Sequence, residues 1–455
     1  RIKEADREIN AFITFKPDEI IGNAKQIDKY IAEGGEIRNF TGIPLAIKDN
    51  ICIRDVRTTC GSKILSDYSS IYDATVIKKL NAHKFLLLGK ANMDEFAMGS
   101  SNENSAFGVV KNPWDTVRVP GGSSGGPAAS VASFEAVCSL GSDTGGSIRQ
   151  PASLCGVVGF KPTYGRVSRY GLVAFASSLD QIGPFTRDVT DCINLYNAIS
   201  GHDESDSTSI NMKDKQDYIY KPVQDLKGMK AGVPKELMVK EIDSQVKESV
   251  LNTIKILEKN GAEVEETTLP SLEYALSVYY IIAPSEASSN LSRFDGVRYG
   301  YRDKDAQGLR EMYRKTRAAG FGPEVKRRIM IGTYCLSSGY YDAYYEKAQK
   351  VRTLIINDFK KAFSKFDILV SPTSPTTAFK LGERMDDPLM MYLSDICTIP
   401  VNLAGIPAIS IPCGLSADKL PIGFQIMADT LREDNIFKAA HILEREINWK
   451  TEPVI

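Results

Sequence analysis

A serine on a glycine-rich turn is the first feature of this sequence that could perform chemistry. The stretch GSDTGGSIRQ (141–150) matches the phosphate-binding pattern G-x-x-x-x-G-K-[ST] at Gly141 and Gly146. The pattern's lysine is replaced by Ser147, and Ile148 follows, which argues against an ATPase. A serine presented by glycines after a strand, where successive N–H groups can converge on an oxyanion, instead indicates a nucleophile.

A nucleophilic serine needs a base, which is most often a histidine. The sequence has three histidines, and none of them lies in a recognisable motif: His83, His202 and His441. Lys48, in GIPLAIKDN (42–50), is the other candidate, because a buried lysine can lose its charge and act as the base in a Ser-Lys arrangement. On a strand, Leu45 and Ile47 would face one side and Lys48 the other. Periodicity alone favours a solvated lysine at this position.

A second serine motif precedes Ser147. The stretch PGGSSGGPAASVASF (120–134) surrounds Ser123 and Ser124 with four glycines, which allow close backbone approach. Its composition is also that of a flexible linker. Pro127 suits the first turn of a helix, and a strand-like run follows, so we favour an ordered turn over a linker.

The composition is that of a packed globular protein. Of the 455 residues, 43% are hydrophobic and 25% charged. The 56 basic and 57 acidic residues nearly balance, so the chain offers no bulk attraction to nucleic acid. The eight cysteines are spread singly, which favours reduced thiols and argues against a zinc site.

The longest uncharged run, CTIPVNLAGIPAISIPCGL (397–415), contains three prolines. Prolines disrupt a spanning helix, so we predict strand and turn there and no contact with a membrane. The chain begins at Arg1 rather than at a methionine, and we expect its natural start to lie upstream.

Strand-like runs alternate with helical patterns along the chain. Strands are predicted at 44–51, 85–89, 136–141, 230–234, 368–372 and 408–413. A helix is predicted at 244–261, where apolar residues recur at helical spacing before a closing Gly261. This alternation predicts an α/β fold with a sheet covered on both faces. We expect a single domain over 1–455, with a polar surface excursion at 201–222.

Three of these segments together resemble the amidase signature family. They are GIPLAIKDN (42–50), GGSSGG (121–126) and DTGGSIR (143–149), and family-like sequence continues to PIGFQIMA (421–428). The resemblance covers nearly the whole chain and implies that family's fold, a large central mixed β-sheet with helices on both faces. One departure is Pro127, where relatives commonly carry a small polar residue.

The resemblance also implies a catalytic arrangement. Ser147 would be the nucleophile, Ser123 a bridging serine that follows a cis peptide bond, and Lys48 the base. The oxyanion hole would consist of backbone N–H groups in one short loop, those of Thr144, Gly145, Gly146 and Ser147. No metal and no cofactor is implied for this chain.

Within the family, the segments MDEFAMGSSNENSAFG (93–108) and APSEASSNLSRFDGVRYG (283–300) are similar to the glutaminase component of tRNA-dependent amidotransferases. Such a component hydrolyses glutamine and supplies ammonia for amidation of Glu-tRNA(Gln) or Asp-tRNA(Asn). A tRNA-binding kinase/transamidase subunit would use ATP and Mg, and a small third subunit would complete a heterotrimer. The tRNA would be held only through the tRNA-binding partner, and the partners would decide which tRNA is amidated. The resemblance implies the bacterial cytoplasm, or an organellar matrix or stroma.

Glutamine carries a carboxylate and an ammonium, so its pocket requires one cation and one anion. The resemblance assigns the glutamine carboxylate to Arg328 and the ammonium to Asp395. Tyr279 would line the pocket. By composition alone, 326–328 reads as a solvated charge run. Whether Arg327 or Arg328, and Tyr279 or Tyr280, faces the substrate stays open at this point.

Three other functions fit parts of the sequence. A stand-alone amidase of the same family would act on a simple carboxamide without partners. A penicillin-binding-type acylase needs S-x-x-K, which SADK (416–419) matches, but no K-T-G occurs. A non-catalytic scaffold would have lost its chemistry, whereas Lys48, Ser123 and Ser147 are all retained.

Overall fold

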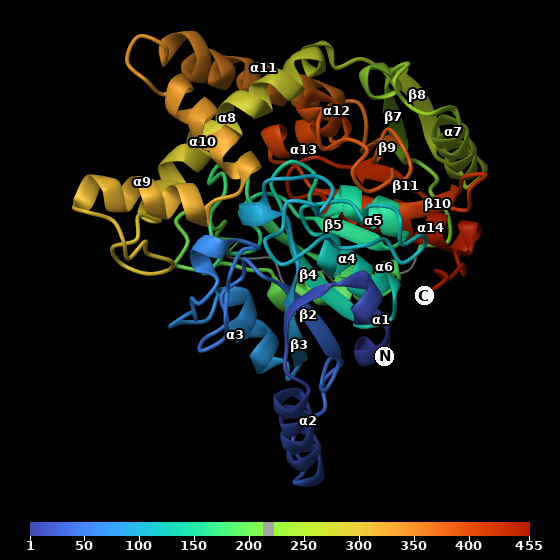
Figure 1. Ribbon diagram of the computed structural model, residues 1–455. Helices are drawn as coiled ribbons and strands as arrows, with labels where there is room; N and C mark the ends of the chain where they lie inside the picture. The colour runs from blue at the N-terminus through green and yellow to red at the C-terminus, as the bar shows by residue number, and fades with distance from the viewer. Residues whose placement is uncertain (213–222) are drawn as a thin grey trace.

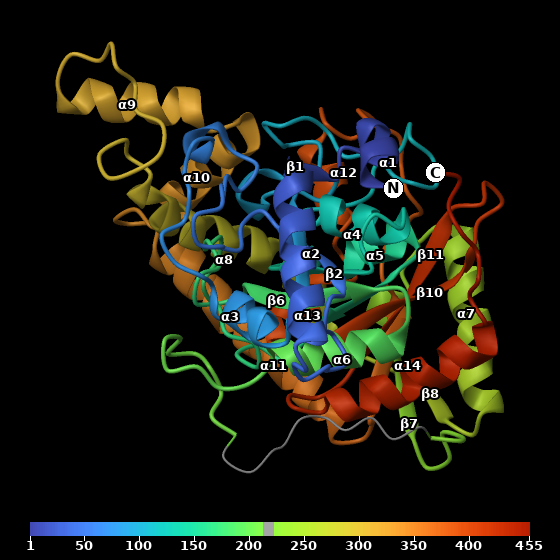
Figure 2. The ribbon, with the colours of Figure 1, turned by 90° about the horizontal axis from the view of Figure 1, so that it is seen from below.

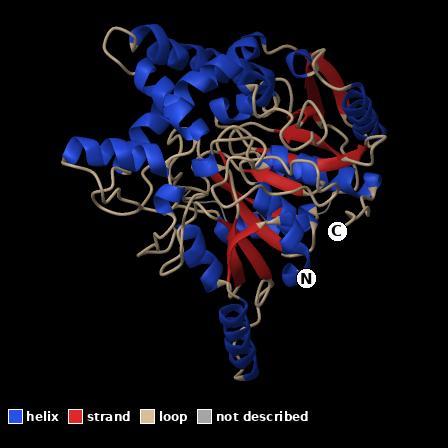
Figure 3. Cartoon of the chain, viewed as in Figure 1, coloured by secondary structure: helices blue, strands red, loops and turns tan. Residues whose placement is uncertain are grey.

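An eleven-stranded mixed sheet forms the centre of the molecule (Figure 3). The computed structural model describes residues 1–212 and 223–455. In spatial order the strands are β1 (Phe12–Phe15), β3 (Leu86–Ala91), β2 (Pro44–Lys48), β4 (Cys138–Asp143), β6 (Gln181–Thr186), β5 (Val158–Lys161), β10 (Ala408–Leu415), β11 (Pro421–Met427), β9 (Ile368–Pro372), β7 (Lys230–Pro234) and β8 (Glu263–Thr267). The pairs β2–β3, β2–β4, β7–β8 and β7–β9 are parallel, and the other neighbours are antiparallel.

Helices flank this sheet on both faces (Figure 1). They are α1 (Ile2–Ile9), α2 (Pro17–Ala32), α3 (Thr75–Ala82), α4 (Gly125–Ala132), α5 (Arg149–Cys155), α6 (Val189–Ile199), α7 (Ser244–Lys259), α8 (Ala275–Asn290), α9 (Leu309–Gly320), α10 (Pro323–Cys335), α11 (Lys347–Phe363), α12 (Pro388–Leu393), α13 (Ile399–Ala404) and α14 (Glu433–Ile447). In Figure 2, α6 and α14 lie on one side of the strands, and α4 and α5 on the other. The predicted α/β fold with a mixed, two-sided sheet is confirmed.

All six predicted strands are present, with ends that differ by up to three residues. The predicted helix at 244–261 is α7, which begins after Asp243. The Asp243 carboxylate accepts hydrogen bonds from the backbone N–H groups of Gln245 and Val246 and so caps the helix. The periodic apolar residues Val246, Val250 and Leu257 are buried, as helical spacing requires.

The prediction of strand and turn across 397–415 is wrong in its first half. Residues Ile399–Ala404 form the short helix α13, with Pro400 in its first turn. Proline is compatible with that position because the first helical N–H groups have no partner within the helix. Gly405, at φ 73°, ends the helix, and β10 follows as expected. No helix in the described part of the chain is long and apolar enough to cross a membrane.

The predicted polar excursion lies only partly within the described residues. Residues 201–212 contain no helix or strand. Asp203 connects this stretch to the start of α3 and to the loop between β5 and β6, because its carboxylate accepts hydrogen bonds from the hydroxyls of Thr75 and Ser168. The rest of the prediction, residues 213–222, lies outside the residues that the structure describes.

The order of the strands brings the chemically interesting segments together. β2 and β4 are parallel neighbours, with Ile47 opposite Leu140. Parallel strands end at the same edge of a sheet, so the end of β2, at Lys48, lies beside the loop that follows β4. That loop contains Ser147.

Candidate active site

Lys48 and the first serine motif form a buried hydrogen-bonded group. The Lys48 Nζ atom lies 2.7 Å from the Oγ atom of Ser123 and 2.7 Å from that of Ser124. The carbonyl oxygen of Ser142 lies 3.2 Å from the same nitrogen. The peptide bond between Gly122 and Ser123 is cis, as the resemblance implies.

Lys48 is completely buried, so the solvated lysine that periodicity favoured is not what the structure contains. Burial lowers the pKa of Lys48 from 10.5 to about 7, because an ammonium loses hydration inside the protein. The carboxylates of Asp94, Asp143 and Asp180 act in the opposite direction and raise it. At neutral pH the lysine is therefore held near the midpoint between its charged and neutral forms.

Ser147 lies on the loop between β4 and α5, beside the first serine motif. Its backbone oxygen accepts a hydrogen bond from the Ser124 N–H at 3.3 Å. The residue is buried, with 7% of its surface exposed, and its hydroxyl makes no hydrogen bond to any described residue. The hydroxyl is therefore unengaged.

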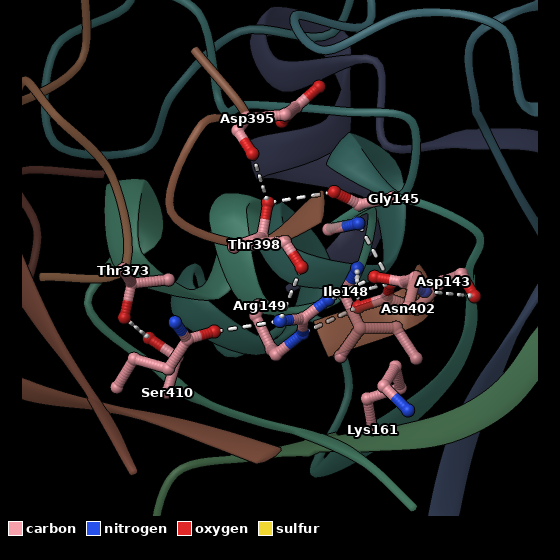
Figure 4. Close-up of polar contacts among 12 residues, drawn as sticks. Asp143, Gly145, Ile148, Arg149, Lys161, Thr373, Asp395, Thr398, Asn402 and Ser410 are labelled. Atoms are coloured by element: carbon pink, nitrogen blue, oxygen red, sulfur yellow. Dashed lines mark hydrogen bonds and ion pairs between the residues drawn. The ribbon is translucent and has the colours of Figure 1, made fainter. Parts of the chain in front are cut away.

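The glycines of this loop are required by their neighbours. A Cβ on Gly145 would lie 2.7 Å from the ring and hydroxyl of Tyr279. A Cβ on Gly146, which has φ +136°, would lie 2.1 Å from the Thr398 hydroxyl. Figure 4 shows the Thr398 side chain beside Gly145, whose backbone oxygen accepts its hydroxyl at 2.7 Å. The loop is thus in contact with Tyr279 of α8 on one side and with Thr398, at the start of α13, on the other.

An ion pair between Asp143 and Arg149 stabilises the loop. Both side chains are fully buried, and Arg149 Nε lies 3.0 Å from Asp143 Oδ2 (Figure 4). Asn402 also donates to the carboxylate, at 2.9 Å. Although burial raises the Asp143 pKa, Arg149, with Lys161 and Asn402, outweighs burial and holds it at about 2. This carboxylate is therefore permanently ionised.

One predicted oxyanion donor is already engaged. The Gly146 N–H donates to Asp143 Oδ1 at 2.8 Å. The N–H groups of Thr144, Gly145 and Ser147 have no hydrogen-bond acceptor among the described residues. The Thr144 hydroxyl donates to Asp180 at 2.7 Å. Of the four predicted donors, Gly146 is thus the one whose N–H group is already occupied in the described structure.

The structure separates the two arginines that the sequence left open. Arg328 is 3% exposed at its side chain, whereas Arg327 is 43% exposed. Glu324, one helical turn earlier, accepts a hydrogen bond from Arg328 Nε at 2.8 Å. The guanidinium lies 5.3 Å from the ring centre of Tyr280 and 5.4 Å from that of Tyr392. Tyr280 therefore faces Arg328, while Tyr279 packs against the loop.

Asp395 is buried with one oxygen unpartnered. Its Oδ2 atom accepts a hydrogen bond from the Ser100 hydroxyl, and its Oδ1 atom has no partner in the described structure. Burial raises the pKa of Asp395 to about 7, and Arg328 lowers it. An arriving cation would satisfy the free oxygen and favour the ionised form.

A cavity of about 490 Å³ adjoins this group. Its walls include Gly99, Ser101, Glu324, Arg328 and Tyr392. Ser101 also lies close to the first serine motif, since a Cβ on Gly122 would be 2.7 Å from the Ser101 N atom. The cavity thus reaches Arg328 and Ser101, while Lys48, Ser123 and Ser147 are not among its lining residues. The described residues contain no cluster of three or more His, Cys, Asp or Glu side chains arranged to hold a metal ion.

A family model described as Amidase matches residues 1–437. The chain belongs to the amidase family. This amidase is 59% identical over 452 residues to a protein of Halothermothrix orenii that is named as one of the subunits of Glutamyl-tRNA(Gln) amidotransferase, covering 99% of this chain and 93% of that one. A protein of the same name from Desulforamulus reducens is 58% identical and covers 99% and 92%.

Solved structures agree with this membership. The crystal structure of the Glutamyl-tRNA(Gln) amidotransferase subunit of the same name from Thermotoga maritima superimposes with a TM-score of 0.81 at 47% identity, covering 98% of this amidase and 89% of that chain. The peptide amidase from Stenotrophomonas maltophilia superimposes with a TM-score of 0.82 at 27% identity, covering 99% and 92%.

Several residues of this amidase's site were not predicted. Glu324 was detectable in principle, because an acidic residue four positions before an arginine on a helix can pair with it. Ser124 stands in the same motif as Ser123. Thr398, Asn402 and Tyr392 come from a distant segment that contains α12 and α13, and they contact the site through the tertiary fold, so no local pattern signals them.

Proposed function

We propose that this chain is the glutamine-hydrolysing subunit of a tRNA-dependent amidotransferase and that Ser147 is its nucleophile. One observation carries the proposal. Lys48 is fully buried and hydrogen-bonded to Ser123, in the motif that adjoins Ser147, whose hydroxyl is unengaged. Two relatives of 58% and 59% identity bear the name of a subunit of such an enzyme.

The hydrogen bonds around Lys48 favour a base directed at Ser123. A neutral amine has two hydrogens and one lone pair. The Ser142 carbonyl oxygen can only accept, and it also accepts the Ser124 hydroxyl at 3.1 Å, so the Ser124 oxygen accepts from Lys48. These two contacts use both amine hydrogens. The lone pair is left for the hydroxyl proton of Ser123.

A relay follows from this arrangement. Ser147 attacks the side-chain amide carbon of glutamine while its proton passes to Ser123 and the Ser123 proton passes to Lys48. The carbonyl π electrons move to oxygen and form an oxyanion. When the carbonyl re-forms, the C–N bond breaks, and the nitrogen leaves as ammonia with the proton returned by Lys48 through Ser123. Water then attacks the glutamyl ester by the same relay and releases glutamate.

The loop that follows β4 would stabilise the oxyanion. The N–H groups of Thr144, Gly145 and Ser147 have no acceptor among the described residues and suit this role. Gly146 would join the proposed hole only after it releases its bond to Asp143. The buried ion pair of Asp143 with Arg149 holds the loop, so the other three donors need not reorganise during the reaction.

Arg328 would bind the glutamine carboxylate and Asp395 its ammonium. Arg328 is buried and oriented by Glu324, which suits a fixed cation for a carboxylate. Asp395 supplies an unpartnered oxygen. Tyr279 lies against Gly145, and we assign it a lining role next to the side-chain amide of glutamine. The adjoining cavity of about 490 Å³ is large enough to admit an amino acid.

The remaining steps would belong to partner proteins. A tRNA-binding kinase/transamidase subunit would receive the ammonia and use ATP and Mg, and a small third subunit would complete the enzyme. The chain itself would need no cofactor and would contact tRNA only through the tRNA-binding partner. The proposed setting is the bacterial cytoplasm, or an organellar matrix or stroma.

A second candidate is a stand-alone amidase, since the peptide amidase of Stenotrophomonas maltophilia shares the fold at 27% identity. The test is ammonia release from glutamine, asparagine and a plain carboxamide, with and without the two added partners. Selectivity for glutamine and stimulation by the partners support the amidotransferase. Faster release from another amide, unaffected by the partners, contradicts it, and activity in Ser147→Ala contradicts the proposed nucleophile.

A further inference from the structure

Helix α10 has two faces of opposite character. Its buried face carries Glu324 and Arg328, next to the proposed glutamine site. Its exposed face carries two apolar side chains in succession, Met330 at 72% exposure and Ile331 at 37%, followed one turn later by Tyr334 at 47%. Single exposed apolar residues are common, whereas a contiguous exposed group marks an interaction surface.

An aromatic cluster extends this exposed face beyond the end of α10. The ring centre of Tyr334 lies 4.5 Å from that of Tyr340 and 5.6 Å from that of Tyr344. All three are more than one third exposed. We call Tyr334, Tyr340 and Tyr344 the tyrosine cluster. Tyrosine and methionine are enriched where proteins bind one another. Tyrosine gives large contact area with few rotatable bonds, and the flexible methionine adapts to the shape of its partner.

The segment around this surface carries the opposite charge balance from the rest of the chain. Residues 298–350 contain twelve Lys and Arg residues and six Asp and Glu, whereas the chain as a whole has 56 and 57. On α9, Arg310 and Arg314 are exposed, and their side chains make no ion pair or hydrogen bond with another described residue. Figures 1 and 2 both show α9 and α10 on the same side of the molecule. A partner for this side should therefore be acidic.

The surface is continuous with the mouth of the cavity. Lys326 and Arg327, on the exposed face of α10, line the cavity together with Arg328. A protein docked on this face would thus lie beside the opening that leads to the proposed glutamine site. That position suits a protein that works together with this chain.

We propose that the exposed face of α10 and the tyrosine cluster dock another protein of the same enzyme, whose matching surface is apolar at its centre and acidic at its rim. The inference rests on the proposed function, and the relatives' name states that they are parts of a larger enzyme. An RNA partner is disfavoured by Met330 and Ile331, because aliphatic side chains neither neutralise phosphates nor stack on bases.

The test measures binding of the full chain to the purified partner proteins of the Halothermothrix orenii amidotransferase, from the enzyme whose corresponding chain is 59% identical to this one. Met330→Glu places a charge in the apolar centre, and Tyr334→Ala removes a ring of the cluster. Arg314→Glu reverses a charge on α9, on the same side of the molecule. Ile71→Glu is the matched control, because Ile71 is 77% exposed on the segment before α3.

We expect Met330→Glu and Tyr334→Ala to weaken binding at least about tenfold. Arg314→Glu should slow association and reduce its salt dependence. The Ile71→Glu variant should bind as the unaltered chain does. The proposal is overturned if the unaltered chain does not bind the partner proteins or if the two central variants bind as tightly as it does. It is also overturned if the isolated chain binds tRNA and those variants abolish that binding.

The same proteins separate this proposal from the proposed function. Met330 and Tyr334 take no part in the proposed chemistry, so ammonia release from glutamine by the isolated variants should stay within about twofold of the unaltered chain. Binding without any glutamine hydrolysis would contradict the proposed function and leave the docking surface standing. If the chain hydrolyses glutamine but the variants do not change its binding to the partner proteins, the docking surface is contradicted and the proposed function stands.

Discussion

The pH dependence of ammonia release tests whether neutral Lys48 is the base. Burial lowers its pKa from 10.5 to about 7. If the neutral amine is required, kcat follows the neutral fraction, which is about one half at pH 7, about one tenth at pH 6 and about nine tenths at pH 8. A lysine of ordinary pKa would be neutral in only about one molecule in 3000 at pH 7.

The same shift carries a cost in stability whose sign can be checked. A difference of about 3.5 pKa units corresponds to about 5 kcal/mol, and Lys48 is fully buried, so solvent screens little of it. The folded-state pKa lies below the unfolded value, so the unfolded chain binds the proton more readily. The cost therefore grows as the pH falls from about 10.5 to about 7 and stays constant below that. As the pH falls from about 10.5 to about 7, the free energy of unfolding of the unaltered chain should therefore decrease relative to that of Lys48→Met.

Asp395 could produce a similar acid limb, because its pKa is also raised to about 7. At saturating glutamine, however, the bound ammonium keeps Asp395 ionised, so kcat reports Lys48 while kcat/KM reports both groups. The assay is coupled detection of ammonia from pH 5.5 to 9, with circular dichroism at each pH to confirm folding. A kcat that stays constant down to pH 5.5, or one that still rises about tenfold per pH unit up to pH 9, would refute the Lys48 reasoning.

Three further outcomes are expected. Ser147→Ala should remain folded, release no ammonia and form no ester with glutamine, which mass spectrometry of the denatured protein can check. Arg328→Gln should raise KM for glutamine about 10- to 100-fold because a buried charge-assisted pair is lost, whereas Arg327→Gln, at a 43% exposed position, should leave KM within about twofold. Asp143→Asn should lower the free energy of unfolding by about 3–5 kcal/mol in urea titrations, because it leaves a buried arginine unpaired.

The sequence was sufficient for six of the eleven strands and, through the family resemblance, for the grouping of Lys48 with Ser123. Short strand-like runs located β2, β4 and β10, and nearly all residues of β2 and β4 are buried, as in a sheet covered on both faces. Lys48, Ser123 and Ser147 each stand in a motif whose glycines and prolines constrain the backbone locally. Their meeting depends on the parallel pairing of β2 with β4, which the alternation of elements favours.

The substrate side of the site was less predictable because it depends on orientation. Periodicity does not distinguish Arg327 from Arg328 when both follow a lysine in one helical turn. The structure separates them because Val325 and Gly332 share the buried face of α10 with Arg328. A Cβ on Gly332 would lie 1.9 Å from the backbone oxygen of Pro284, so that face is pressed closely onto α8. This contact between helices fixes the rotation of α10, and no local sequence pattern encodes it.

The charge of Lys48 also depends on carboxylates that do not contact the proposed substrate. Asp94 is the strongest of the interactions that raise the Lys48 pKa, although burial and its own hydrogen bonds leave the pKa of Asp94 at about 6. Asp94 accepts the backbone N–H groups of Asn102 and Asn104, at 2.9 and 3.0 Å, so part of its charge is already compensated.

Removing the Asp94 charge should therefore shift the pH profile in one direction. In Asp94→Asn, the protonated form of Lys48 loses its strongest stabilising carboxylate, while the burial that lowers the pKa is unchanged. The inflection in kcat should move below pH 7, and the side-chain oxygen of asparagine can still accept a backbone N–H. An inflection that rises or does not move would show that the carboxylates do not set the charge of Lys48. A fall would show that the basicity of the site is set by residues outside the serine-lysine group.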